Sequence, residues 1–335
     1  MKKKPIVISV IIVVVLACII TCYKQVFATY EYEPVRVNVP AGTPKGNVKK
    51  IFTDVLGYDF GSKVAVLWSL QGGTPESSHG SYVVKTGDKA WKVARNIAKG
   101  RQTPVRVTFN NLRFVEELAA KMDNYLELDS AQFIAAADTV LSSRGYTYEQ
   151  WQGAFMPDTY EFYWTTPASE VVSRLNDHAR AFWTPERTAK AESLGMSPMD
   201  MEIIASIVEE ESNRAEEHGK VGRLYINRIQ DDRPLQADPT IKFVVHNFAL
   251  RRIFRPDTKK ESPYNTYLNK GLPPGPIRIP EGATIDSVLN SKPHPYYFMC
   301  ASPDFSGRHV FAKTFPEHRQ NAVLYHRALD RRGVK

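Results

Sequence analysis

The chain has 335 residues, of which 43% are hydrophobic and 24% are charged, a composition typical of a globular protein long enough for two domains. The formal net charge of +8 would suit a nucleic acid, an anionic lipid surface or a carboxylate-bearing polymer, although an ordinary basic surface gives the same value. Only three cysteines occur, and two of them share one apolar segment, which excludes a disulfide framework. The eight histidines lack ligand spacing, so we expect no metal site and no cofactor.

An apolar run extends from Ile6 to Cys22 and follows three lysines. Its length is near the lower limit of roughly 17 residues for a spanning helix, and the lysines would hold the N-terminus inside. A cleaved signal peptide also has a basic start, but no A-x-A-like site follows the run, and the apolar residues after Cys18 fit a lipoprotein site poorly. We therefore expect a cytoplasmic tail over residues 1–5 and one transmembrane helix over residues 6–23.

A strand, turn and helix pattern then occurs twice. Val39–Thr43 leads into Val48–Ile51, and Val84–Asp88 leads into Val93–Ile97, with a glycine in each turn. Neither unit can bury its helix alone, because each helix face needs a neighbouring strand. This pattern predicts a small, compact α+β module over residues 36–105.

The remaining residues, 106–335, are enough for one larger α+β domain with a single core. Before this domain, the polar stretch Gln71–Gly80 is predicted to be a loop. A third strand is predicted to begin at Val105. Proline and glycine are dense over Pro256–Pro295, which predicts a loop-rich region that shapes a cleft. A helix over Pro316–Arg331 is predicted to follow.

One helix begins with a strong set of capping signals. Ser197 is suited to the N-cap, Pro198 to the first helical position, and Asp200 to the reciprocal capping position. With successive residues 100° apart, the isoleucines and valine of this helix form one apolar stripe. Glu211 falls in the middle of that stripe.

The two neighbouring acids fall elsewhere on the same helix. Glu210 lies at the margin of the stripe, and Glu209 lies opposite it, where a solvated position is expected. A buried carboxylate is costly unless it is paired or neutral, so Glu211 is either paired with an arginine or held as a neutral acid with a raised pKa. Arg214, Arg223 and Arg228 are the arginines nearby in sequence. A raised pKa is what a general acid requires near neutral pH.

Several ordered motifs resemble the endolytic murein transglycosylases of the MltG (YceG-like) family over roughly residues 100 to 335. The most specific is Tyr264–Tyr267 followed by Gly271–Ile277. The others are Gly153–Tyr160, Ala205–Glu211, Asn227–Arg228, Leu235–Thr240, His309–Phe311, Thr314 and His318. The resemblance implies a LysM-like module at residues 36–105 and a YceG-like catalytic domain at residues 106–335.

The resemblance also implies a reaction. Glu211 matches the second glutamate of the family's E-x-E pattern, whereas Glu210 departs from it and would raise the local negative charge. The family cleaves the β-1,4 bond between N-acetylmuramic acid and N-acetylglucosamine without water and leaves a 1,6-anhydro end, which would end elongation of nascent strands. The candidates for substrate binding are Asn265, Tyr264, Gln236, Asp238, Thr240 and Asp158. For Asp158, a turn or a helix cap is the competing role.

Two other functions stay open. A water-using muramidase would need a second carboxylate, which Asp238 or Asp158 could supply. A non-catalytic wall-binding or division scaffold would keep the fold without the chemistry. The implied partners are peptidoglycan glycan strands, the bacterial inner membrane through one helix, and penicillin-binding proteins, with the enzyme domain on the periplasmic side. A nucleic acid is disfavoured, because no basic stripe with interleaved aromatic residues occurs.

Overall fold

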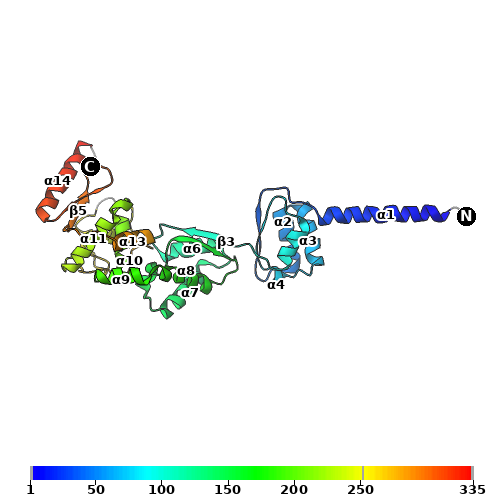
Figure 1. Cartoon of the computed structure of the whole chain (residues 1–335), viewed down its shortest axis with the longest axis horizontal. Helices are drawn as coiled ribbons and strands as arrows, with labels where there is room; N and C mark the ends of the chain where they lie inside the picture. Colours follow the sequence, from blue (N-terminus) through cyan, green and yellow to red (C-terminus); the bar gives the residue numbers. More distant parts are fainter. Residues whose placement is uncertain (1–2, 251–252, 333–335) are drawn as a thin grey trace. The chain divides into compact units, whose positions relative to one another are not determined.

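The computed structural model describes residues 3–250 and 253–332 as a mostly helical α+β protein (Figure 1). The described part contains three two-stranded sheets, β1–β2, β3–β4 and β5–β6. It divides into two compact units: the first takes residues up to Val107 together with Asp123–Leu128 and Tyr160–Pro167, and the remaining residues form the second. The predicted α+β class is confirmed, and the module and domain boundaries stay predictions.

The elements of the first part of the chain, in order, are α1 (Lys3–Val26), β1 (Val35–Val39), α2 (Lys45–Leu56), α3 (Tyr58–Leu70), α4 (Pro75–Ser78), β2 (Gly80–Val84) and α5 (Ala90–Ala98). The later elements are β3 (Val105–Phe109), α6 (Val115–Tyr125), α7 (Ser130–Ser143), the 3-10 helix η1 (Tyr148–Ala154), β4 (Asp158–Phe162), α8 (Ala168–Phe182), α9 (Pro185–Ser193), α10 (Pro198–Glu211), α11 (Ala215–Gln230), α12 (Asp238–Val244), η2 (Asp257–Lys259), α13 (Gly282–Leu289), β5 (Phe298–Ala301), β6 (His309–Ala312) and α14 (Phe315–Arg331).

Helix α1 covers the predicted apolar segment. Side chains such as Ile11, Val13 and Ile19 are more than half exposed along it. Nevertheless, no helix within the described residues is both long and apolar enough to cross a membrane. The predicted transmembrane helix over residues 6–23 is therefore not found there, and residues 1 and 2 of the predicted cytoplasmic tail lie outside the described part.

The repeated strand, turn and helix pattern in the first unit is confirmed. Strands β1 and β2 pair antiparallel, and the turns before α2 and α5 contain Gly42 and Gly87, whose φ values are +69° and +89°. Glycine suits these turns because other residues rarely adopt that backbone conformation. Two helices were missed: α3 contributes Trp68 to the core, and α4 lies inside the predicted loop, where Thr74 and Ser77 form a capping box.

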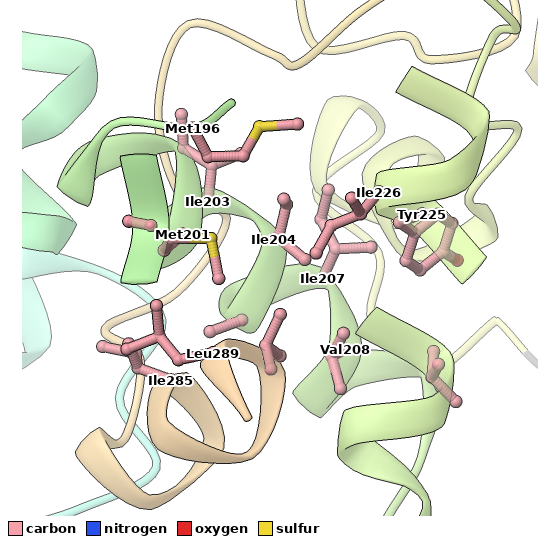
Figure 2. Close-up of a cluster of buried hydrophobic side chains, with 14 of the residues drawn as sticks. Met196, Met201, Ile203, Ile204, Ile207, Val208, Tyr225, Ile226, Ile285 and Leu289 are labelled. Atoms are coloured by element: carbon pink, nitrogen blue, oxygen red, sulfur yellow. The ribbon is translucent and has the colours of Figure 1, made fainter. Parts of the chain in front are cut away.

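The second unit is built around α10, which contacts η1, α9, α11, α12 and α13. Figure 2 shows Ile204, Ile207 and Val208 of α10 among side chains of α11 and α13. All eight residues from Met201 to Val208 are buried. Helix α10 is therefore a central helix covered on all sides, and not the half-exposed helix that its sequence suggested.

Two glycines allow α11 to lie directly against α13. A Cβ at Gly219 would meet the backbone oxygen of Ser287 at 2.7 Å, and a Cβ at Gly222 would meet the Val288 side chain at 2.6 Å. Any larger residue would push the helices apart, because a packed interior cannot absorb such overlaps. This close packing fixes α11 beside α10 and sets the position of the side chains that face the end of α10.

Candidate active site

The site lies where α10 ends. The Ser197 side chain caps the start of α10 and accepts a hydrogen bond from the Asp200 N–H, as predicted. The helix ends at Glu211, because Ser212 adopts an extended conformation with φ −136°. Glu211 is partly buried and lines a cavity of about 440 Å³. The other lining residues used below are Tyr225, Arg228, Gln236, Asp238, Tyr267 and His309.

The Glu211 carboxyl is held by one strong hydrogen bond. The buried Tyr225 hydroxyl on α11 donates to Glu211 Oε1 at 2.8 Å. The pKa of Glu211 is raised to about 7, chiefly by burial; Asp238 contributes to the rise, whereas the Tyr225 hydrogen bond, His309 and Lys242 oppose it. The hydrogen-bond partner of this carboxyl is thus a tyrosine and not the arginine of the alternative interpretation, and a carboxyl with this pKa is available as an acid near neutral pH.

Removal of the Tyr225 hydroxyl gives a testable pH effect. The bond favours the charged form of Glu211, so Tyr225→Phe should raise the pKa of that carboxyl. If protonated Glu211 is the active form in the free enzyme, activity falls as pH rises through this pKa. The alkaline limb of kcat/KM should therefore begin near pH 7 in the wild type and move to higher pH in Tyr225→Phe. An unmoved limb would show that another group controls it.

An arginine shapes one wall of the cavity. Arg228 is buried, and its guanidinium donates to the backbone oxygens of Pro234 and Tyr297 and to Gln236 Oε1, at 2.9, 2.7 and 2.8 Å. Gln236 has a φ of +52°, a strained conformation for a non-glycine residue. The guanidinium therefore connects α11 to two other segments, residues 234–236 and the residues around Tyr297, and holds Gln236 in place.

A buried carboxylate also orients a histidine that lines the cavity. Glu217 on α11 is buried, and its Oε2 lies 3.0 Å from His309 Nδ1. The His309 backbone N–H also donates to Glu217, at 3.0 and 3.2 Å to its two oxygens. These contacts fix the ring that lines the cavity. His309 belongs to one of the sequence motifs, but no role follows for it from the sequence. Glu217 and Tyr225 were not predicted, because nothing in their spacing relates them to Glu211.

The structure separates the predicted substrate-binding residues into three groups. Gln236 and Asp238 line the cavity with Glu211, and the Tyr267 hydroxyl donates to Asp238. Asn265 and Thr240 are buried behind it. The Asn265 amide donates to two backbone oxygens, those of Thr258 and Lys260, and the Thr240 hydroxyl pairs with Thr266. These two residues support the wall and do not line the cavity.

The third group lies away from this cavity. Tyr264 lines a different cavity, and Asp158 is an exposed residue at the start of β4 that pairs with His178 at 3.0 Å. The alternative prediction of a turn or helix cap for Asp158 is wrong, because the residue belongs to a strand.

The prediction of a solvated Glu209 is also wrong. Its side chain is only 6% exposed and pairs with Arg278 at 2.9 Å. Glu210 is 12% exposed and pairs with Arg278 at 3.0 Å and with Arg113 at 2.9 Å. Helical angles could not reveal this, because Arg278 comes from the proline-rich segment that covers the opposite side of α10. Glu210 is therefore neutralised by two arginines and does not act as the acid that raises the pKa of Glu211.

A protein-family model described as the YceG-like family matches residues 37–323. The chain belongs to the YceG-like family. This membership confirms the resemblance that the sequence motifs indicated. The cavity at Glu211 is lined by residues from six of those motifs, namely Glu211, Arg228, Gln236 with Asp238, Tyr267, His309 and His318.

Curated relatives of this YceG-like chain match about half of it. An endolytic murein transglycosylase of Bacillus subtilis is 29% identical over 180 residues, which cover 52% of this chain and 48% of that protein. An endolytic murein transglycosylase of Streptococcus pneumoniae is 27% identical over 181 residues, which cover 51% and 32%. The chain thus spans about half the length of the first relative and about a third of the second.

A solved structure shares the fold. A YceG-like protein from Listeria monocytogenes, whose crystal structure was determined at 2.6 Å, covers 86% of this chain and 98% of its own, with a TM-score of 0.57 and 20% identity. At that identity the likeness shows the fold alone.

Proposed function

We propose that this chain is an endolytic murein transglycosylase that cleaves the β-1,4 bond between N-acetylmuramic acid and N-acetylglucosamine in peptidoglycan strands. One observation carries the proposal: in a YceG-like chain, the Glu211 carboxyl lines a cavity with a pKa raised to about 7. The names of the two bacterial relatives support the same activity. Production of 1,6-anhydro ends on nascent strands would end their elongation.

The reaction needs one proton donor that later becomes a base. Protonated Glu211 gives its proton to the leaving O4 of N-acetylglucosamine as the bond from O4 to C1 of N-acetylmuramic acid breaks. The Glu211 carboxylate then takes the proton of the muramyl 6-hydroxyl as O6 bonds to C1. The 1,6-anhydro ring forms, and Glu211 regains its proton. The Asp238 carboxylate, oriented by Tyr267, faces the same cavity and would stabilise the positive charge that develops at C1.

The presence of Asp238 also favours a second candidate function. A water-using muramidase requires a second carboxylate that activates water, and Asp238 lines the same cavity as Glu211. The two reactions differ in their products, because water leaves a reducing end and internal attack leaves an anhydro end.

We also propose that the segment over residues 6–23 anchors the chain in the bacterial inner membrane with the enzyme domain on the periplasmic side. The exposed apolar side chains of α1 support this location. There the domain would meet nascent strands and penicillin-binding proteins. If the full chain leaves the membrane fraction in alkaline carbonate, the anchor is disproved.

Cleavage of purified strands tests the enzymatic proposal. The full chain is incubated with uncrosslinked glycan strands of defined length, and the fragments are separated by size. Endolytic cleavage predicts internal fragments of intermediate length. Release of disaccharides alone would contradict endolytic action, and intact strands would identify a non-catalytic scaffold.

A further inference from the structure

A second cavity of about 560 Å³ lies in the same unit as Glu211 and has aromatic walls. Five rings line it: Phe114, Tyr148, Phe243, His246 and Tyr264. The rings of Phe114 and Phe243 stack with their centroids 5.7 Å apart, and the Tyr264 ring packs on Phe243 at 4.8 Å. Faces of such rings attract organic cations.

The charged residues that line this cavity are all acidic among residues 3–250 and 253–332. They are Glu116, Glu117 and Glu149, and no lysine or arginine of the described part lines it. Glu117 accepts hydrogen bonds from the backbone N–H groups of Arg113 and Phe114, so its charge is partly used within the fold. Glu116 and Glu149 are exposed, and neither forms an ion pair within the described residues. Two uncompensated carboxylates beside aromatic faces, in a chain of net charge +8, favour a cationic ligand.

An unpaired acceptor provides a third, independent feature. Gln152 lines the same cavity, and its Oε1 is buried without a hydrogen-bond partner in the part of the chain that the structure describes. A buried amide oxygen normally has a donor, and no described group supplies one here. The aromatic faces and the exposed carboxylates together match a primary ammonium, which carries one positive charge and three N–H donors.

Two segments connect this cavity with the one at Glu211. Helix α12 contributes Asp238 to the Glu211 cavity and Phe243 to the second cavity. Their separation of five positions corresponds to a rise of about 8 Å along the helix. The following motif repeats this division, because Tyr264 lines the second cavity and Tyr267 lines the first. The two cavities are therefore lined in part by the same two segments.

We propose that the second cavity binds the free primary ammonium of a peptide branch on the glycan strand whose bond lies at Glu211. This inference rests on the proposed function. A cross-link converts that amine into an amide and removes its charge, so the cavity would favour strands that are not yet cross-linked. The second cavity is then a specificity site for the same reaction.

Chemical modification of the amine tests this proposal. The full chain is given uncrosslinked strands with free amines, the same strands after N-acetylation, and strands after reductive methylation, which keeps the positive charge. We expect acetylation to raise KM about tenfold, because it removes the charge that contacts the aromatic faces and the carboxylates. Methylation keeps that charge and should change KM little. Equal KM values for free and acetylated strands would overturn the proposal.

Variants then assign the effect to this cavity. The double variant Glu116→Gln with Glu149→Gln should have, for every strand, a KM as high as that of the wild type for acetylated strands. It should therefore no longer distinguish acetylated from free amines. Glu192→Gln, an exposed change on α9 away from the lining residues, should keep the wild-type preference. If the double variant still prefers free amines, the ammonium binds elsewhere and the proposal is wrong.

Failure of the ammonium site can be distinguished from failure of the proposed enzymatic function. Strands whose peptides have been removed should still be cleaved, although with the higher KM. If these strands and the free-amine strands all stay intact, the proposed enzymatic function fails. In that case, the dissociation constants of free and acetylated strands, measured with the Glu211→Gln chain, still test the ammonium site: a difference of about tenfold supports it and equal values overturn it.

Discussion

Replacement of Glu211 by glutamine should lower the rate of strand cleavage by about 10²- to 10⁴-fold, which is the usual contribution of a general acid–base group. Glutamine has nearly the same shape but carries no transferable proton. Because Glu211 ends its helix and faces a cavity, the fold should be retained. The measurement is kcat on uncrosslinked strands together with the thermal unfolding midpoint of each chain.

A nearby acid provides the matched control for this variant. Glu216→Gln changes an exposed carboxylate in the first turn of α11 and should keep both activity and stability. Wild-type activity in Glu211→Gln would show that another residue supplies the proton. Unfolding of Glu211→Gln would instead reveal a structural role for this carboxyl.

Replacement of Arg278 by methionine should destabilise the protein by about 3–5 kcal/mol. Arg278 is 8% exposed and pairs with both Glu209 and Glu210, so its loss leaves Glu209 buried without that ion pair. Methionine retains the apolar stem of the side chain, so the effect comes mainly from the lost charge and hydrogen bonds. The free energy of unfolding in denaturant measures it.

Two further variants distinguish ion-pair loss from poor packing. Arg174→Met removes an exposed arginine that lies 4.0 Å from Glu170, and it should change stability by less than about 0.5 kcal/mol. Addition of Glu209→Gln to Arg278→Met should recover a large part of the loss, because Glu210 keeps its ion pair with Arg113 and no buried carboxylate then lacks its partner. If the double variant is no more stable than Arg278→Met, the buried charge of Glu209 is not the cause.

The helix that carries Glu211 illustrates what local sequence can predict. Its start follows from Ser197 and Pro198, because capping depends on residues a few positions apart. The orientation of Glu209 could not be predicted in the same way. Its partner Arg278 comes from a distant segment, and an amphipathic pattern assumes that one helix face meets water.

The residues of the active site also divide into those that local sequence predicts and those that it does not. Glu211, Gln236 and Asp238 lie in recognisable motifs, and the structure brings them into one cavity. The hydroxyl of Tyr225 and the pair between Glu217 and His309 reach that cavity only because α11 packs closely against α10 and because β6 follows much later in the chain. Such contacts depend on tertiary packing, which spacing along one segment does not encode.

The ends of the cleaved strands test the central claim most directly. Wild-type chain is incubated with uncrosslinked strands in ¹⁸O-labelled water, and the fragments are analysed by mass spectrometry. We expect 1,6-anhydro-muramyl ends that contain no label, because the 6-hydroxyl and not water attacks C1. Reducing muramyl ends that carry ¹⁸O would contradict it and would assign Glu211 and Asp238 to a hydrolase.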